Sequence, residues 1–210
     1  MKLFLSYFKR QSLKILFAYS AILLVINSKA QQTTLYYDIV QNEDVIGHLV
    51  VYKKVDGNKT LYKLKSIVKA KFIFSYSSEI NEMVVFENGL MIYSFFHEME
   101  NGKETFIETK LLGNNFLFIK NGRVYSQHNT PVFSNILQLY TDAPSSGTKT
   151  FSNHFQQLVN VRKISENRYG LSLPGGHYNY YHYKKGVCTQ IDVVRTLFTI
   201  HIVLKNQISS

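Results

Sequence analysis

The stretch KTLYKLKSIVKAKFIF, residues 59–74, places an apolar side chain at nearly every second position and lysines between them. The apolar set is Tyr62, Leu64, Val68, Ala70 and Phe72, and the charged set is Lys63, Lys65, Lys69 and Lys71. Successive side chains of a β-strand point to opposite faces, so the pattern predicts a strand with one buried and one solvated face. The lysine face is open to two interpretations. The favoured one is a solvated outer face, partly neutralised by cross-strand Glu98, Glu104 or Glu108, and the alternative is a surface that binds an anionic partner.

Short turn signals flank this stretch and recur along the chain. They are QNED at 41–44, DGN at 56–58, ENG at 87–89, ENGK at 100–103, GNN at 113–115, KNG at 120–122, PGG at 174–176 and KKG at 184–186. Asn and Gly supply the positive φ that tight hairpin turns require, and the intervening runs are rich in β-branched and aromatic residues. The chain is therefore predicted to be mainly β, a curved antiparallel meander or partly open barrel.

One segment departs from this pattern. TPVFSNILQLYTDAPSSG, residues 130–147, begins with Pro131, a residue favoured at helix starts, and contains Pro144 and Gly147 as stop signals. The apolar residues between them at helical spacing are Val132, Ile136, Leu139 and Tyr140. We predict one short helix of two to three turns that covers or plugs the concave side of the sheet.

The first thirty residues have the features of an export signal. Four basic residues precede an apolar run at 15–26, and Ser28 and Ala30 stand at the −3 and −1 positions before Gln31. The alternative is a membrane anchor, but a spanning helix needs about 20 apolar residues. We expect residues 1–30 to be a cleaved signal peptide and residues 31–210 to be a single β-rich domain, periplasmic or secreted and not membrane-spanning after cleavage.

Charge and cysteine content narrow the possible partners. The chain carries 24 basic and 14 acidic residues, a net charge of +10, but five of the bases belong to the leader and leave +5. This mild excess favours solubility rather than a nucleic-acid partner. Cys188 is the single cysteine, so an internal disulfide is excluded and the core alone must stabilise the domain.

Motifs of catalysis and metal binding are missing from the sequence. GLSLP at 170–174 lacks the final glycine of a nucleophile elbow, and phosphate-binding loops and HExxH are absent. His177 and His182 project to opposite faces of any strand and cannot share a metal without a bulge. We expect no catalytic residues, no metal site and no cofactor, and Cys188 to be a packed thiol.

The stretch PGGHYNYYHYKKGVC, residues 174–188, is the densest aromatic segment. On a strand, Tyr181 and Tyr183 share one face, and Tyr178 and Tyr180 share the other. We interpret the strip first as a wall of the fold and second as a binding surface. Its four tyrosines are the candidate ligand-binding residues, because their rings offer apolar area and their hydroxyls can orient a ligand.

Three segments carry a family resemblance: residues 36–76, VFENGLMIYS at 85–94, and LSLPGGHYNYYHYKKGVCTQIDV at 171–193. Together they resemble a family of small exported β-rich proteins of unknown function from gram-negative bacteria. The resemblance implies an exported β-rich domain and supplies no reaction or ligand. The overall plan is also similar to that of periplasmic lipoprotein carriers, a likeness of architecture alone.

Three functions remain open. The first is a non-catalytic exported module that binds or carries an apolar or lipid-like ligand in the cell envelope. The alternative is a structural or protein-interaction component of the envelope without a small-molecule ligand. The third is a hydrolase of an unfamiliar kind, which the missing catalytic motifs disfavour.

Overall fold

The computed structural model describes residues 30–71, 75–195 and 198–210. The expectations for the leader and for Phe72 therefore concern residues outside the described ones. The strands are β1 (Gln31–Gln41), β2 (Asp44–Asp56), β3 (Lys59–Lys71), β4 (Ser75–Glu87), β5 (Leu90–Glu100), β6 (Lys103–Leu112), β7 (Asn115–Lys120), β8 (Arg123–His128), β9 (Lys149–Ser152), β10 (Gln157–Ser165), β11 (Arg168–Leu173), β12 (His177–Lys184), β13 (Val187–Val194) and β14 (Thr199–Ser209). Two short 3-10 helices are η1 (Ile136–Tyr140) and η2 (Pro174–Gly176).

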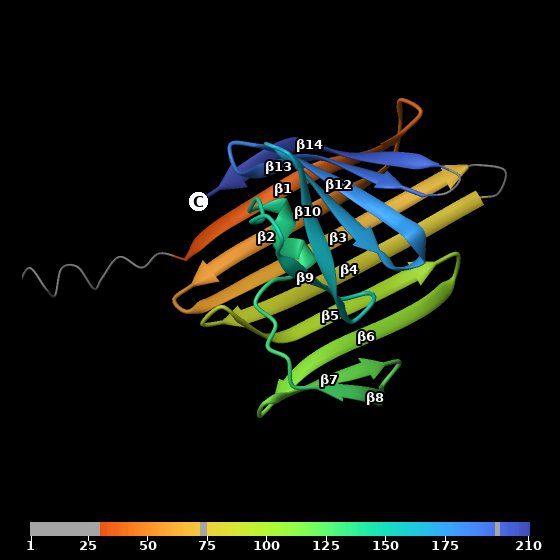
Figure 1. Ribbon diagram of the computed structural model, residues 1–210. Helices are drawn as coiled ribbons and strands as arrows, with labels where there is room; N and C mark the ends of the chain where they lie inside the picture. Colours follow the sequence, from red (N-terminus) through yellow and green to blue (C-terminus); the bar gives the residue numbers. More distant parts are fainter. Residues whose placement is uncertain (1–29, 72–74, 196–197) are drawn as a thin grey trace, which may run out of the picture. The chain divides into compact units, whose positions relative to one another are not determined.

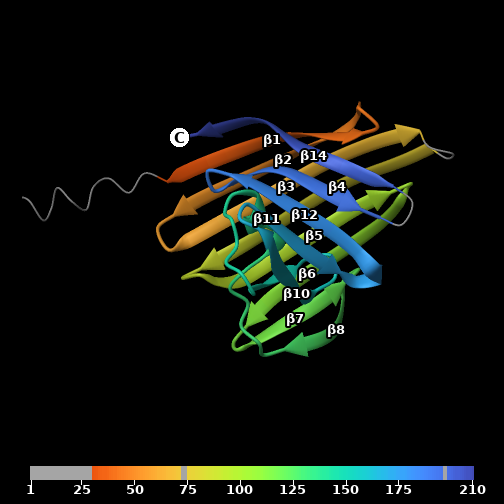
Figure 2. The same ribbon diagram turned by 45° about the horizontal axis from the view of Figure 1, so that its top comes forward.

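The fourteen strands form one sheet in the order β8-β7-β6-β5-β4-β3-β2-β1-β14-β13-β12-β11-β10-β9. Neighbouring strands pair antiparallel throughout, from β1 with β14 at the centre to β7 with β8 near one edge. The sheet curls so that β9–β12 lie over the concave side of β3–β6, which both ribbon views show (Figures 1 and 2). Strands β8 and β9 are the two edges of the described sheet and do not pair with each other, so the sheet does not close into a barrel. The predicted curved antiparallel meander or partly open barrel is therefore confirmed.

Two-residue turns join most neighbouring strands at the predicted positions. In the turn between β4 and β5, Asn88 has φ 51° and Gly89 has φ 77°. Both values lie in the left-handed region, which gives a turn whose twist matches that of the flanking strands. The same pair of residue types turns the chain at 101–102 and 121–122. The Asn-Gly signals were therefore sufficient to locate these hairpins.

The alternation predicted for β3 is present. Tyr62 and Leu64 are buried, whereas Lys63 and Lys65 are exposed on the outer face. The acidic partner differs from the three predicted ones, because the Lys65 ammonium lies 3.3 Å from Glu79 on β4. The three glutamates predicted to neutralise the lysine face have other partners. Glu104 pairs with His97, Glu108 pairs with Lys110, and Glu98 is hydrogen-bonded to Ser78.

The predicted helix is present on the concave side but is shorter than expected. It is a 3-10 helix of five residues, Ile136–Tyr140, and it follows Asn135, whose side chain accepts a hydrogen bond from the Leu137 amide at 3.0 Å. Residues 132–134 lie outside the helix, and two of their carbonyl groups accept hydrogen bonds from other segments: Val132 accepts from the Met91 amide, and Ser134 from the Phe151 amide. Among the described residues, no helix is long and apolar enough to cross a membrane.

Candidate functional site

The tyrosine strip forms strand β12, and its side chains divide between the two faces as predicted. Tyr181 and Tyr183 point inward, with exposed fractions of 1% and 6%. Tyr178 and Tyr180 point outward; Tyr178 is 44% exposed and Tyr180 is half-buried. The structure therefore does not bring the four candidate residues together, and each pair has its own set of neighbours.

The inward pair is part of a packed aromatic interior. The Tyr183 hydroxyl donates a 2.7 Å hydrogen bond to the Leu139 carbonyl of η1, and Tyr37 donates one of 2.9 Å to the carbonyl of Cys188. The Tyr140 ring, also on η1, meets the rings of Tyr37 and Tyr181 edge to face. Side chains of the protein thus occupy the concave side at the level of β12, and these two tyrosines act as a wall of the fold.

The Cys188 side chain lies in the same interior. Burial raises the pKa of its thiol to about 12, so the sulfur is protonated near neutral pH. The thiol donates a 3.4 Å hydrogen bond to the Gln190 carbonyl. A nucleophilic cysteine requires a thiolate, so Cys188 is a packing residue.

A carboxyl group that was not identified from the sequence also faces inward. Glu82 on β4 accepts a 3.0 Å hydrogen bond from the Asn153 side chain, which in turn accepts one of 2.7 Å from Asn135, the cap of η1. Burial raises the pKa of Glu82 to about 7, and this hydrogen bond and the charge of Glu98 have smaller effects. The signal in the sequence was the strand alternation, which places Glu82 among apolar residues on the buried face.

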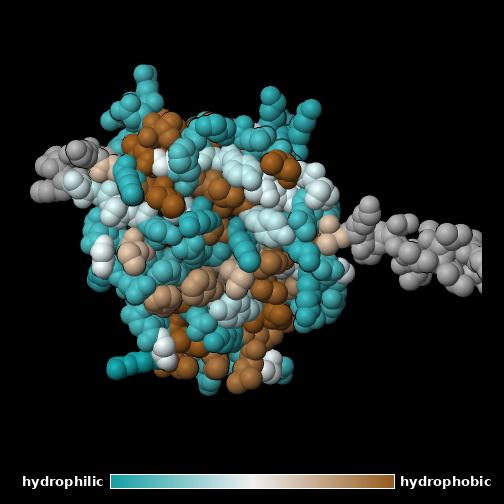
Figure 3. Space-filling view, turned by 180° about the vertical axis from the view of Figure 1, so that it is seen from behind, coloured by the Kyte–Doolittle hydropathy of each residue, from teal (hydrophilic) through white to brown (hydrophobic). Residues whose placement is uncertain are grey.

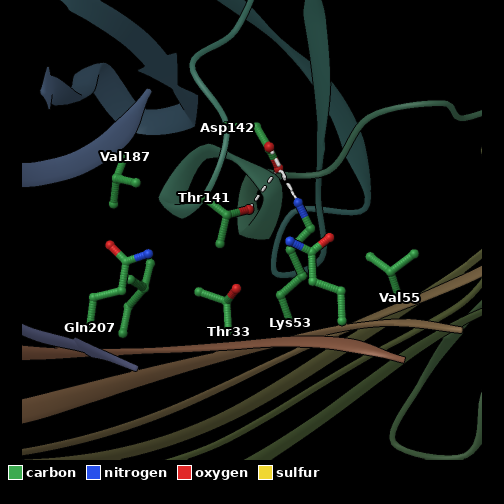
Figure 4. A pocket seen from close by; sticks show the side chains of 9 residues that line it. Thr33, Lys53, Val55, Thr141, Asp142, Val187 and Gln207 are labelled. Atoms are coloured by element: carbon green, nitrogen blue, oxygen red, sulfur yellow. Dashed lines mark hydrogen bonds and ion pairs between the residues drawn. The ribbon is translucent and has the colours of Figure 1, made fainter. Parts of the chain in front are cut away.

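A pocket of about 200 Å³ opens at one end of the curled sheet, beside the end of η1. Figure 4 shows Thr33, Lys53 and Val55 rising from the strands toward Thr141 and Asp142. The residues that line it are Gln31, Thr33, Leu35, Lys53, Val55, Thr141, Asp142, Val187 and Gln207. We call this space the end pocket; its lining combines one ion pair, two primary amides and two hydroxyls.

The ion pair Lys53–Asp142 is the main electrostatic feature of the end pocket. The ammonium lies 2.9 and 3.2 Å from the two carboxylate oxygens, and the Thr141 hydroxyl donates to the same carboxylate at 2.7 Å. Burial acts to lower the pKa of Lys53, but the hydrogen bond to Asp142 and the electrostatic effects of Tyr62 and Asp142 together outweigh burial, so the pKa is raised. The Lys53 ammonium is therefore charged near neutral pH. They are 22% and 55% exposed, so Lys53 is the deeper of the two.

The described residues contain no cluster of three or more His, Cys, Asp or Glu side chains placed to hold a metal ion. The end pocket likewise offers one lysine and one aspartate, a set that suits hydrogen bonding rather than metal coordination. Its donors and acceptors lie on several sides of a small space, an arrangement that can form hydrogen bonds with a polar molecule.

Comparisons with known proteins agree with this architecture. A crystal structure of a β-barrel-like protein of a domain of unknown function (DUF1849) from Brucella abortus is similar, with a TM-score of 0.59 and 8% identity over 85% of this chain and 98% of that chain. At this identity the likeness concerns the fold alone. No curated protein matches the sequence. Residues 37–205 match the model of a family described as a domain of unknown function, DUF6134. The chain therefore belongs to the DUF6134 family.

Proposed function

We propose that this chain is an exported, non-catalytic binding module whose ligand is a small zwitterion of amino-acid size, held in the end pocket. The observation that carries the proposal is the pair of opposite charges, Lys53 and Asp142, fixed 2.9 Å apart at a space of about 200 Å³. Export is inferred from the leader pattern of residues 1–30.

The charges of the end pocket favour a net-neutral ligand. A purely anionic molecule would be attracted by Lys53 but repelled by Asp142. A purely cationic molecule would be attracted by Asp142 but repelled by Lys53. A zwitterion can place its carboxylate at Lys53 and its ammonium at Asp142. The amides of Gln31 and Gln207 and the hydroxyl of Thr33 then supply further donors and acceptors.

The filled interior and the polar lining of the end pocket disfavour the apolar carrier proposed from the sequence. A carrier for a lipid-like molecule needs an apolar cavity, whereas the interior beside β12 is filled by Tyr37, Tyr140, Tyr181 and Tyr183. An apolar ligand in the end pocket would desolvate the ion pair and the amides without hydrogen-bonding to them. The polar pocket therefore supports a binding module of a different ligand class.

A thermal-shift experiment on the purified protein tests this proposal. Amino acids that bind well should raise the melting temperature by about 5–10 °C at about 100 times their dissociation constant. The variant Lys53→Met should lose this response. Lys54→Met is the matched control, because Lys54 is the next residue of β2 and also pairs with an aspartate, Asp56, but on the outer face.

Three outcomes would contradict the proposal. The first is the absence of a shift with any free amino acid or dipeptide. The second is an equal loss of response in Lys54→Met and Lys53→Met. The third is a shift with fatty acids that survives Lys53→Met, which would restore the apolar carrier.

A second candidate function, an interaction component of the envelope, is favoured by the outer face of β5 and β6. There the rings of Phe95, His97 and Phe106 lie next to one another. The Phe106 ring stacks on the His97 ring with 4.2 Å between the ring centroids. Phe106 is 39% exposed and Met99, on the same face, 45% exposed. Figure 3 shows apolar side chains on this side of the molecule as separate patches among hydrophilic ones. A photo-crosslinking residue at Phe106, compared with one at Lys63, tests for a protein partner in intact cells.

A further inference from the structure

We propose a second binding site, for a saccharide chain, on the outer face of β11–β14. It joins the two outward tyrosines of β12 to an aspartate that holds two histidines and a glutamine. This inference does not depend on the end pocket, whose lining residues on β1 and β2 face the interior. It rests on the orientation of the polar groups, an adjoining pocket and the aromatic surface.

Asp192 on β13 organises the polar part of the site. Its carboxylate lies 2.7 Å from His182 Nε2 on β12, 2.8 Å from His201 Nδ1 on β14 and 2.7 Å from Gln190 Nε2 on its own strand. The Asp192 side chain is 14% exposed, whereas those of His182 and His201 are 33% and 44% exposed. The aspartate thus lies beneath its partners and fixes their orientation, as a carboxylate does behind a functional histidine.

Each of these three partners retains a second polar atom that faces away from Asp192. These atoms are Nδ1 of His182, Nε2 of His201 and Oε1 of Gln190, and none of them has a hydrogen-bond partner among the described residues. In the tautomer that donates its bonded N–H group to Asp192, each histidine keeps its other ring nitrogen as an acceptor. The face therefore presents oriented acceptors to a ligand rich in hydroxyl groups.

A shallow pocket of about 570 Å³ adjoins this cluster, between the turn that joins β1 to β2 and the outer face of β14. Its lining residues are Val40, Asn42, Glu43, Gln190, Thr199, His201 and Val203. His201 and Gln190 belong both to the pocket and to the cluster around Asp192. The volume lies within the range typical of small-molecule sites, so the pocket can hold one end of an extended ligand.

The aromatic part lies on the neighbouring strands. The rings of Tyr178 and Tyr180 are nearly parallel, with an interplanar angle of 12° and centroids 6.5 Å apart. The guanidinium of Arg168 lies 4.6 Å from the centre of the Tyr180 ring. Gly170 stands opposite Tyr180, and a Cβ there would lie only 3.3 Å from that ring. The glycine thus allows the Tyr180 ring to lie close to β11, where the cation–π contact holds it.

This combination matches the chemistry of a saccharide. The faces of a pyranose ring carry C–H groups that pack against aromatic rings, and its edge carries hydroxyls that donate to fixed nitrogens and amide oxygens. An apolar chain would leave the cluster around Asp192 desolvated and unsatisfied. The charges of Arg168 and Asp192 balance, and Glu43 lines the pocket, so the face has no excess of positive charge for nucleic acid.

Affinity electrophoresis and calorimetry with chitotetraose, cellotetraose and maltotetraose test the site in the purified protein. We expect at least one of the three to bind. The double variant Tyr178→Ala/Tyr180→Ala and the single variant His201→Gln should each weaken that binding about tenfold or more. Tyr36→Ala and His48→Ala are the matched controls, and both should bind as the wild type does. Tyr36 is an outward tyrosine on β1, 37% exposed, and His48 lies 2.8 Å from Asp38 on the outer face.

The melting temperature of each variant separates loss of binding from loss of folding. If the double variant does not fold, His201→Gln alone decides the matter, because it retains a polar side chain at an exposed position. No binding of any of the three oligosaccharides would overturn the proposal, as would equal losses in the test and control variants. If peptides from a tryptic digest of casein shield the Tyr178 and Tyr180 side chains from solvent and the sugars do not, the face binds peptides instead.

Discussion

The two faces of β12 carry the same residue type in opposite surroundings. Tyr181 is 1% exposed and lies against Tyr140 of η1, whereas Tyr178, on the same strand, is 44% exposed and has the ring of Tyr180 beside it. The difference shows that a run of tyrosines does not have one role. The pleat of the strand assigns one face to the stability of the fold and leaves the other available for recognition.

The strongest way to test this comparison is to truncate an inward ring. Tyr181→Ala removes a fully buried aromatic side chain from a packed interior, so the free energy of unfolding should fall by about 3–5 kcal/mol. Urea denaturation followed by circular dichroism measures the change. A loss below about 1 kcal/mol would mean that the interior beside β12 is not tightly packed and would reopen the apolar carrier.

The carboxyl group of Glu82, on the inward face, makes the stability of the protein depend on pH. The pKa of Glu82 is raised to about 7 from 4.5, so the folded protein binds this proton more tightly than the unfolded chain does. Stability should be greatest below about pH 4.5 with respect to this group, fall as the pH rises, and level off above about pH 7. Glu82→Gln keeps an acceptor for Asn153 but cannot ionise.

The expected effect of this substitution follows from the size of the shift. We expect Glu82→Gln to stabilise the protein by about 2–4 kcal/mol at pH 8 and to have little effect at pH 4.5. Denaturant titrations at the two pH values measure the difference. An equal effect at both would show that Glu82 does not change its charge between them in the folded protein.

Much of the fold was predictable because it depends on local patterns. The faces of β3 follow from alternation, and the turns follow from Asn and Gly at positions that need positive φ, as at Asn88. The extent of η1 was not predictable in this way. Its start after Asn135 depends on hydrogen bonds that the Val132 and Ser134 carbonyls accept from the Met91 and Phe151 amides, which lie outside the local segment.

The sites were less predictable than the fold because they join distant segments. Lys53 and Asp142 are separated by 89 positions, and no local motif connects them. The acidic residue that neutralises the lysine face was misidentified for a related reason, since the contact of Glu79 with Lys65 depends on the register of β3 against β4. The strip of tyrosines was visible in the sequence, but the polar cluster of Asp192 beside Tyr178 and Tyr180 required two further strands, β13 and β14, to be placed.

A smaller effect is expected from a single hydroxyl on the inward face. Tyr183→Phe keeps the ring and removes the hydroxyl that donates to the Leu139 carbonyl at 2.7 Å. The carbonyl would remain buried without that partner, so the free energy of unfolding should fall by about 1–2 kcal/mol. Tyr180→Phe, on the outward face, is the control, and its stability should match that of the wild type in the same denaturation experiment.

The smallest effect on stability is expected where the largest effect on recognition is proposed. Tyr178→Ala removes a ring that is 44% exposed, so the free energy of unfolding should change by less than about 1 kcal/mol. If the outward face binds a saccharide, the same variant should weaken that binding several-fold, because the ring supplies apolar contact area to the ligand. Urea denaturation and calorimetry on one preparation measure both quantities. A large loss of stability without a change in binding would place Tyr178 with Tyr181 as a residue of the fold, and the contrast between the two faces of β12 would then be wrong.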